Sequence, residues 1–154
     1  MADGITITVL GVKELQVQID RLARALGAAA VEPVLLDGAN IVANAARVKA
    51  RYDSERTEGI HLRDAIVAKT LKTRILNEPR PAIAAVDRKK APHAYMVEHG
   101  TGERIGKRGK YRGRRFGRMP AQPFMRPAWN ENKERVLQGI ARDLGTLLDR
   151  AAGK

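Results

Sequence analysis

The segment Gly102–Arg118 constrains the fold most, because almost nothing in it can be buried. Its glycines recur every three or four residues, with cationic side chains between them. Like charges at this density repel one another and favour an extended, solvated chain. So few apolar groups cannot offset the entropic cost of ordering the segment. We therefore expect an exposed, mobile loop, with the core built from the residues on either side. The eight cations, in fifteen residues without an acid, are Arg104, Lys107, Arg108, Lys110, Arg112, Arg114, Arg115 and Arg118.

This loop also holds most of the charge. The chain has a net charge of +12, and eight of the positive charges lie in the loop. Such a segment is typical of an arm that follows phosphates or binds an acidic protein surface. The alternative is a solvated loop that only keeps the protein in solution. Tyr111 and Phe116 could stack on bases. The spacing carries no code for reading sequence, so any contact with nucleic acid is expected to be non-specific.

The remaining composition predicts a modest aliphatic core. The chain has 154 residues, 44% of them hydrophobic but only 4% aromatic, which suits one domain spanning residues 1–154. It has no cysteine, so disulfides and thiolate zinc sites are excluded. No apolar run reaches the roughly 20 residues needed to cross a bilayer. The first residues do not have the pattern of a secretion signal. We expect a soluble protein made in a cytoplasm, with no membrane partner.

The N-terminal half predicts one strand followed by two helices. Residues 5–9 form a β-branched run typical of a strand. Residues 12–26 have apolar residues at helical spacing. A second helix is predicted over 33–52, since Pro33 suits a first helical turn, and residues 53–59 are polar and predict a loop. The predicted face of the second helix comprises Leu35, Ala39, Val42, Ala45, Ala46 and Lys49.

The C-terminal half predicts a hairpin and a long helix. Strands are expected over 64–72 and 82–87, joined by a turn at 77–81. Residues 95–97 fit either one helical turn or a bend. A helix is predicted over 127–152. The predicted fold class is α+β: a small antiparallel sheet packed with two N-terminal helices and a long C-terminal helix, plus the extended basic loop. The apolar stripe of the last helix comprises Leu137, Ile140, Leu144, Leu147 and Leu148.

Catalytic and cofactor motifs are missing. A phosphate-binding loop needs four residues between its first glycine and the Gly-Lys pair, then Ser or Thr. Five residues separate Gly100 from Gly106 and three separate Gly102 from Gly106, and Lys107 is followed by another cation. The three histidines do not have the spacing of a helical zinc motif. The single serine, Ser54, lies in a polar loop, which disfavours a serine nucleophile. We therefore expect no enzyme, metal or cofactor.

Two stretches together resemble a known family. Residues 94–101 read AYMVEHGT, and residues 120–128 read PAQPFMRPA and open the last helix. With residues 11–15 and the segment from Gly59 through 62–66, they resemble the neck proteins of tailed bacteriophages, also called tail-completion or head–tail joining proteins. The resemblance spans residues 10 to about 150, and this chain departs from it in its unusually basic loop. The motif positions that carry the resemblance or a scaffolding role are Tyr95, Glu98, Gly100, Pro123, Phe124, Arg126, Pro127 and Trp129.

The resemblance implies a structural virion protein without catalysis. Family members are α+β subunits of a ring, expected here to be a hexamer, around the channel through which DNA leaves the capsid. Its partners would be the head-completion or connector proteins and the tail-terminator or tail-tube proteins. A tail terminator is an alternative assignment. From the residues alone, a stand-alone non-specific nucleic-acid-binding protein also stays open, whereas a nuclease lacks a recognisable acid cluster.

Phe124, Met125 and Trp129 follow the basic loop directly. We interpret them as anchors that fix the start of the last helix to the core. The alternative is an exposed hot spot for a partner. Scaffolding is assigned to Tyr95, Phe124, Pro127 and Trp129.

Overall fold

The computed structural model describes residues 17, 27–52, 59–72 and 79–151. The predicted strand over 5–9, nearly all of the helix over 12–26 and most of the loop over 53–59 lie outside these residues. Within them, the α+β class is confirmed: a two-stranded antiparallel sheet packs with helices, and the last helix is long. None of the described helices is apolar over a length that would reach across a bilayer.

Helix α2 spans Ala28–Lys49 and begins five residues before the predicted start. Pro33 was expected in the first turn, and it lies instead at the sixth helical residue. There it cannot donate to the carbonyl of Ala29. The Val31 and Val34 side chains beside it are buried, so packing keeps the helix intact through the proline. The predicted face was partly right, since Ala39, Val42 and Ala46 are buried but Lys49 is exposed.

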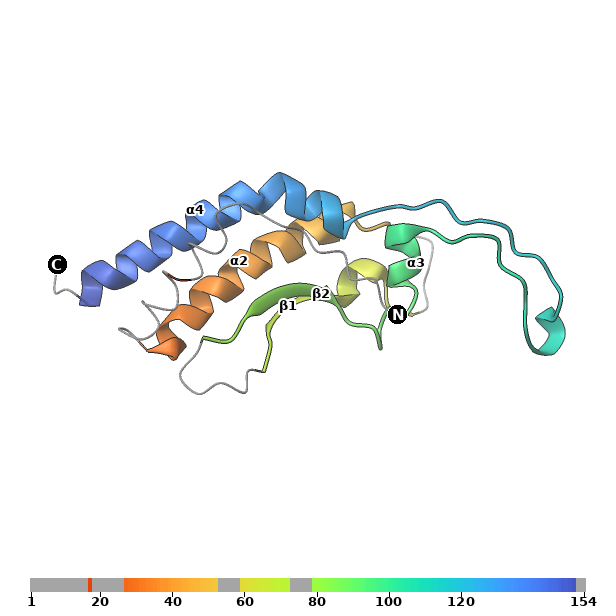
Figure 1. Ribbon diagram of the computed structural model, residues 1–154, viewed down its shortest axis with the longest axis horizontal. Helices are drawn as coiled ribbons and strands as arrows, with labels where there is room; N and C mark the ends of the chain where they lie inside the picture. Colours follow the sequence, from red (N-terminus) through yellow and green to blue (C-terminus); the bar gives the residue numbers. More distant parts are fainter. Residues whose placement is uncertain (1–16, 18–26, 53–58, 73–78, 152–154) are drawn as a thin grey trace.

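Helix α4 spans Met125–Ala151 and lies along α2 (Figure 1). The small residues of α2 let the two helices approach closely. A Cβ atom at Gly38 would lie 3.2 Å from side-chain atoms of both Val136 and Ile140. The predicted stripe needs a correction, because Val136 replaces its neighbour Leu137 as the buried residue and Leu148 is exposed. Ile140 and Leu144 are buried as predicted.

The predicted hairpin is confirmed with shorter strands. Strands β1, Ile66–Thr70, and β2, Ala82–Val86, pair in antiparallel register from Ile66↔Val86 to Thr70↔Ala82. Residues Leu62–Ala65 form a 3₁₀ turn, η1, rather than the start of a strand. The Arg47 guanidinium donates to the carbonyl oxygen of Ile66 from Nε at 3.0 Å and from Nη2 at 2.7 Å. These bonds fix the C-terminal end of α2 to the start of the sheet.

Helix α2 is the central layer, with α4 on one side and the sheet on the other (Figure 1). Two apolar clusters fill the interfaces, and both are built mainly from Ala, Val, Leu and Ile, as the composition predicted. Phe124 is the largest fully buried side chain. One cluster surrounds it and contains Ala43, Ala46, Ala65, Ile66, Ala91, Ala94 and Ala128. The other joins α2 to α4 through Val31, Val34, Val42, Val136, Ile140 and Leu144.

Candidate functional site

The basic segment forms an arm that leaves the body between the short helix α3, Ala94–His99, and α4 (Figure 1). We call residues 102–118 the basic arm. Its exposure is confirmed. Backbone hydrogen bonds join its two sides, a pairing that the sequence did not predict. Phe116 N–H donates to the Arg104 carbonyl at 2.8 Å, and Gly106 N–H donates to the Arg114 carbonyl at 2.8 Å. These bonds need no buried side chain, so a polar, glycine-rich sequence can still form a ribbon.

A tight turn closes the far end of the arm. Gly113 N–H donates to the Gly106 carbonyl at 2.8 Å, and residues Gly109–Tyr111 form one 3₁₀ turn, η2. A Cβ atom at Gly106 would lie 1.7 Å from the Tyr111 carbonyl oxygen, so only glycine fits at this position. The rings of Tyr111 and Phe116 meet edge to face with centroids 5.8 Å apart. Backbone hydrogen bonds and an aromatic contact therefore close the tip, although it contributes nothing to the core.

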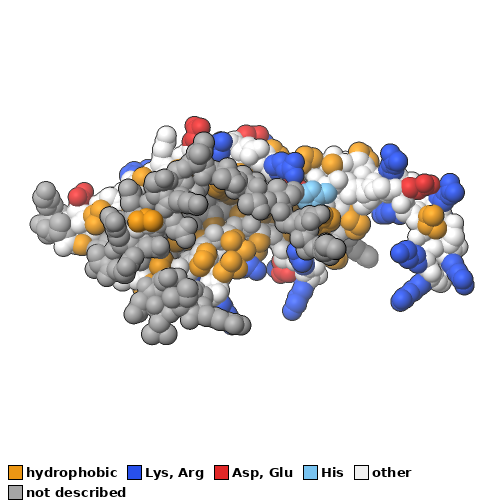
Figure 2. All heavy atoms as spheres, in the orientation of Figure 1, with side chains coloured by type: hydrophobic (Ala, Val, Ile, Leu, Met, Phe, Trp, Pro, Cys, Tyr) orange, Lys and Arg blue, Asp and Glu red, His pale blue; other side chains and the backbone are white. Residues whose placement is uncertain are grey.

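All eight predicted cations of the arm are exposed, and their charges are almost unopposed. Figure 2 shows lysine and arginine side chains spreading from the arm on several sides. Among the described residues, the arm forms one ion pair, between Arg115 and Glu103 at 3.5 Å, and both side chains are more than half exposed. Lys110 lies over the Tyr111 ring at 5.0 Å and Arg114 lies 5.6 Å from the Phe116 ring centre. The arm therefore presents concentrated positive charge to solvent.

The base of the arm is closed by backbone pairing between the two stretches that the sequence singled out. Thr101 N–H donates to the Met119 carbonyl at 2.8 Å, and Gln122 N–H donates to the Val97 carbonyl at 2.8 Å. Gly100 has a φ of 71°, and a Cβ atom there would lie 2.7 Å from the Met119 carbonyl oxygen. Gly100 is therefore required for the two sides of the arm to approach each other where they leave the body.

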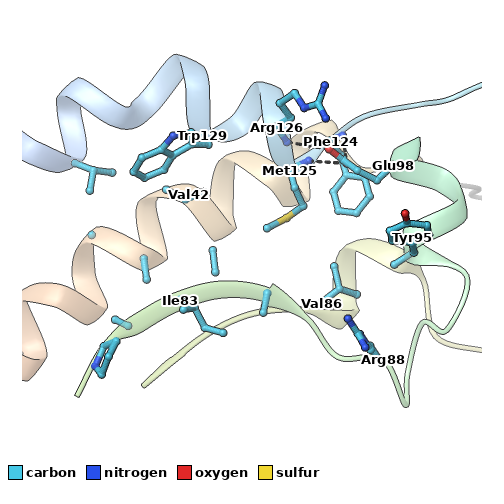
Figure 3. A pocket seen from close by; sticks show the side chains of 18 of the residues that line it. Val42, Ile83, Val86, Arg88, Tyr95, Glu98, Phe124, Met125, Arg126 and Trp129 are labelled. Atoms are coloured by element: carbon cyan, nitrogen blue, oxygen red, sulfur yellow. Dashed lines mark hydrogen bonds between the residues drawn. The ribbon is translucent and has the colours of Figure 1, made fainter. Parts of the chain in front are cut away.

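Glu98 connects α3 to the first turn of α4 (Figure 3). Its carboxylate accepts from the backbone N–H groups of Phe124 at 2.8 Å, Met125 at 3.0 Å and Arg126 at 3.0 Å. Partial burial raises the pKa of this carboxyl. The three N–H donors and nearby His99 outweigh that effect, and the pKa lies below its ordinary value. The Glu98 side chain thus acts as a charged cap of α4, supplied from outside the helix.

The other motif residues divide between the core and the surface. Phe124 is 1% exposed, which agrees with the anchoring interpretation, and Trp129 packs against the cluster between α2 and α4. Pro127 is the third residue of α4, where it needs no N–H donor. The scaffolding role predicted for Tyr95 needs correction, because its side chain is 71% exposed and its ring stacks on the exposed His99, with centroids 4.5 Å apart. Pro123 and the Arg126 side chain are also exposed.

An open groove of roughly 920 Å³ runs between β2, α2, α3 and the start of α4 (Figure 3). Its walls are mainly apolar, with Val42, Ile83, Val86, Met125 and Trp129 among the lining residues. Glu98 and His99 also line it, but Glu98 is held by three backbone donors. A lowered pKa is the opposite of what a general acid requires at neutral pH. The groove has the character of an apolar contact surface.

The three histidines have different surroundings. His61 packs on the Tyr52 ring at 4.6 Å, His99 packs on Tyr95, and His93 precedes α3. Across residues 27–52, 59–72 and 79–151, no group of three or more His, Asp or Glu side chains is arranged to hold a metal ion.

Sequence reasoning found the cations of the arm and both motifs, but it missed how the motifs act. Glu98 was singled out without a role, because a helix cap is recognised by its position just before the helix. Here the cap comes from more than twenty residues upstream. The need for glycine at position 106 likewise depends on a contact with Tyr111 that only the fold creates.

No family model, curated protein or solved structure matches the chain.

Proposed function

We propose that this chain is a structural subunit of the head–tail junction of a tailed bacteriophage. In this proposal it is a neck or tail-completion protein that forms a ring around the DNA channel and joins the capsid connector to the tail. The basic arm then reaches a partner beyond the subunit's own body, either DNA or an acidic neighbour. Catalysis plays no part.

The observation that carries the proposal is that the two motifs resembling the neck family meet at the base of the basic arm. Glu98 of the first motif contacts Phe124 of the second. Thr101, at the end of the first motif, pairs with Met119, the residue just before the second. A joining protein needs such a device, because an arm that makes contacts at a distance transmits force and position only if its base is fixed. The chain takes eight steps from Thr101 to Gly109, and a rise of about 3.3 Å per step gives the arm a reach of about 26 Å.

The body also offers apolar surface for neighbouring subunits. Val48, near the end of α2, is 87% exposed, and Tyr95 on α3 is mostly exposed. Exposed apolar side chains of this size favour a protein contact when they form part of a larger patch. A head-to-tail contact between identical subunits closes into a ring when the rotation per subunit divides the circle. The six-fold number comes from the family resemblance alone.

Native mass spectrometry of the full-length chain tests the ring. A closed oligomer of the 16.9 kDa chain, formed alone or with purified connector or tail proteins, is the expected result. Neutralising Arg112, Arg114 and Arg115 together is expected to leave folding intact and to impair the joining of heads to tails. A chain that stays monomeric with every junction protein and never enters a particle would overturn the proposal.

One rival has support from the structure of the arm. A stand-alone, non-specific nucleic-acid-binding protein needs only an exposed, unopposed set of cations, which the basic arm supplies. It predicts tight, salt-sensitive binding of the monomer to any duplex, whereas a ring subunit binds weakly as a monomer. A tail terminator is a second alternative within the same class, and co-purification with tail-tube protein in place of connector protein would favour it.

A further inference from the structure

We propose that the basic arm lies in the major groove of double-stranded DNA and binds the phosphates on both walls of that groove without reading sequence. The inference rests on the proposed function in one respect, that the partner beyond the body is DNA and not an acidic neighbour. It adds the kind of nucleic acid and the mode of binding.

The shape of the arm fits this groove. The major groove of B-form DNA is about 12 Å wide and admits a two-stranded ribbon. The arm is such a ribbon, with bridges at Thr101↔Met119 and Ile105↔Arg115 and a closed turn at its tip. Its reach of about 26 Å is enough to bring cations from its stem and its tip against the same duplex.

The distribution of charge fits a groove with a phosphate backbone on each side. Both sides of the ribbon carry cations, and one more lies in the turn. An acidic protein patch would select one face of the arm, whereas these side chains spread on several sides (Figure 2). Six of the eight are arginines, whose planar guanidinium matches phosphate with two parallel hydrogen bonds. The outgoing side carries Arg104, Lys107 and Arg108, the turn carries Lys110, and the returning side carries Arg112, Arg114, Arg115 and Arg118.

A second copy of this chain is a poor partner for the arm. The whole chain has a net charge of +12, of which the eight cations and Glu103 within residues 102–118 account for +7. The remaining residues therefore carry a net charge of +5. The body of another copy would repel the arm, so the opposite charge has to come from a different molecule.

The aromatic residues favour a duplex over a single strand. Proteins that bind single strands present free aromatic faces on which successive bases stack. Tyr111 and Phe116 are each 43% exposed, but their rings pack against each other edge to face, and each has a cation beside it. In this arrangement they stiffen the tip of the ribbon and do not form a stacking platform.

Fluorescence anisotropy with the full-length protein tests the mode of binding. The probes are a labelled 20-base-pair DNA duplex, the RNA duplex of the same sequence, single-stranded DNA and polyglutamate. A-form RNA has a deep, narrow major groove that this ribbon cannot enter. We expect the RNA duplex to bind at least tenfold more weakly than the DNA duplex, and a scrambled DNA sequence to bind within twofold. Methyl green, a major-groove ligand, should be displaced, whereas the minor-groove ligand netropsin should not.

Salt dependence tests the phosphate contacts. With about five phosphates bound, the logarithm of affinity should fall against the logarithm of salt concentration with a slope of about −4.5. The triple variant R112Q/R114Q/R115Q should make that slope shallower by about 2.7, at 0.9 per contact. The matched control K89Q/R135Q/R150Q removes the same charge from exposed positions on the body and should leave the slope within about 0.5 of the wild type.

Three results would overturn the inference. Equal affinity for DNA and RNA duplexes would mean that the arm binds by charge alone. Tighter binding to polyglutamate than to DNA would assign the arm to an acidic protein. An equal decrease in the salt slope for the two triple variants would mean that the arm does not contact the DNA. If the chain forms the ring but fails these tests, the proposed function stands and the DNA-binding mode is wrong. If the chain passes these tests without forming a ring, the DNA-binding mode stands and the proposed function is wrong.

Discussion

Glu98 sets the stability of the junction between the arm and the body, so substituting it gives the sharpest test of the fold. The change Glu98→Ala removes the acceptor for three N–H groups at the start of α4, those of Phe124, Met125 and Arg126. No residue of the helix itself replaces it, since the first N–H groups of a helix have no partner within it. Glu98→Gln keeps one oxygen acceptor and turns its NH₂ group toward one of the donors.

The size of the effect follows from these contacts. Loss of a helix cap costs about 0.5–2 kcal/mol, and loss of a negative charge at a helix N-terminus costs about 0.3–1 kcal/mol more. Glu98 is only half-buried, so water reaches the freed N–H groups and the full cost of three charged hydrogen bonds does not apply. We expect Glu98→Ala to lower the free energy of unfolding by about 2 kcal/mol. For a chain of this length that is a fall in Tm of about 4–8 °C.

Thermal and urea unfolding followed by circular dichroism measure this change, with hydrogen exchange to locate it. Glu98→Gln should lose about half as much as Glu98→Ala. Glu134→Ala is the matched control, because Glu134 is exposed on α4, and it should stay within about 0.5 kcal/mol of the wild type. Exchange should accelerate first in the N-terminal turn of α4 and at the Thr101–Met119 pairing. If Glu98→Ala unfolds like the control, Glu98 does not cap α4 and the account of the anchor is wrong.

Three further outcomes are expected. Because the Glu98 pKa is lowered in the folded state, the unfolded state binds more protons in acid. The stability that this carboxylate provides is therefore complete above its ordinary pKa of about 4.3 and is lost as pH falls through the lower folded value. Urea midpoints from pH 6 to 3 should fall less steeply in Glu98→Gln, and parallel curves would contradict this. Gly106→Ala places a Cβ atom against the Tyr111 carbonyl and should open the tip of the arm, with faster amide exchange at Gly113 and an unchanged Tm. Gly102→Ala, which meets nothing within 4 Å, is its control, and equal exchange in both variants would refute the steric argument. Phe124→Ala should cost about 3–5 kcal/mol in urea unfolding, because Phe124 is the largest fully buried side chain, and a loss below 1 kcal/mol would mean that it is no anchor.

The helices and the hairpin were largely predictable because their signals are local. Apolar spacing located α2 and α4, and the turn residues before Ala82 located the hairpin. Boundaries failed where a distant residue sets them. Helix α4 begins at Met125, two residues before its predicted start, in the turn that Glu98 caps. Helix α2 runs through Pro33 because valines on both sides of it are buried.

The candidate site was predictable in its charge but not in its form. A run of arginine, lysine and glycine indicates exposure, and every cation of the arm is exposed. The pairing of Arg104 with Phe116 uses backbone atoms, so no pattern of side chains in the sequence predicts it. Tyr95 was expected to be part of the scaffold because it lies in a motif, yet its side chain is mostly exposed and Glu98 of the same motif makes the contact with α4. A sequence motif indicates which segment makes structural contacts, but it does not indicate which of its side chains make them.

Closure at Thr101 and Met119 makes the arm separable from the body in evolutionary terms. Everything between these residues could be exchanged or shortened without disturbing the core, because Glu98, Gly100 and Phe124 all lie outside it. Replacing the seventeen residues with a four-residue turn changes the entropy of loop closure by only about 1 kcal/mol. A protein of this kind can bind a new partner when only the arm is replaced. The greatest sequence divergence among its relatives should therefore fall within the arm.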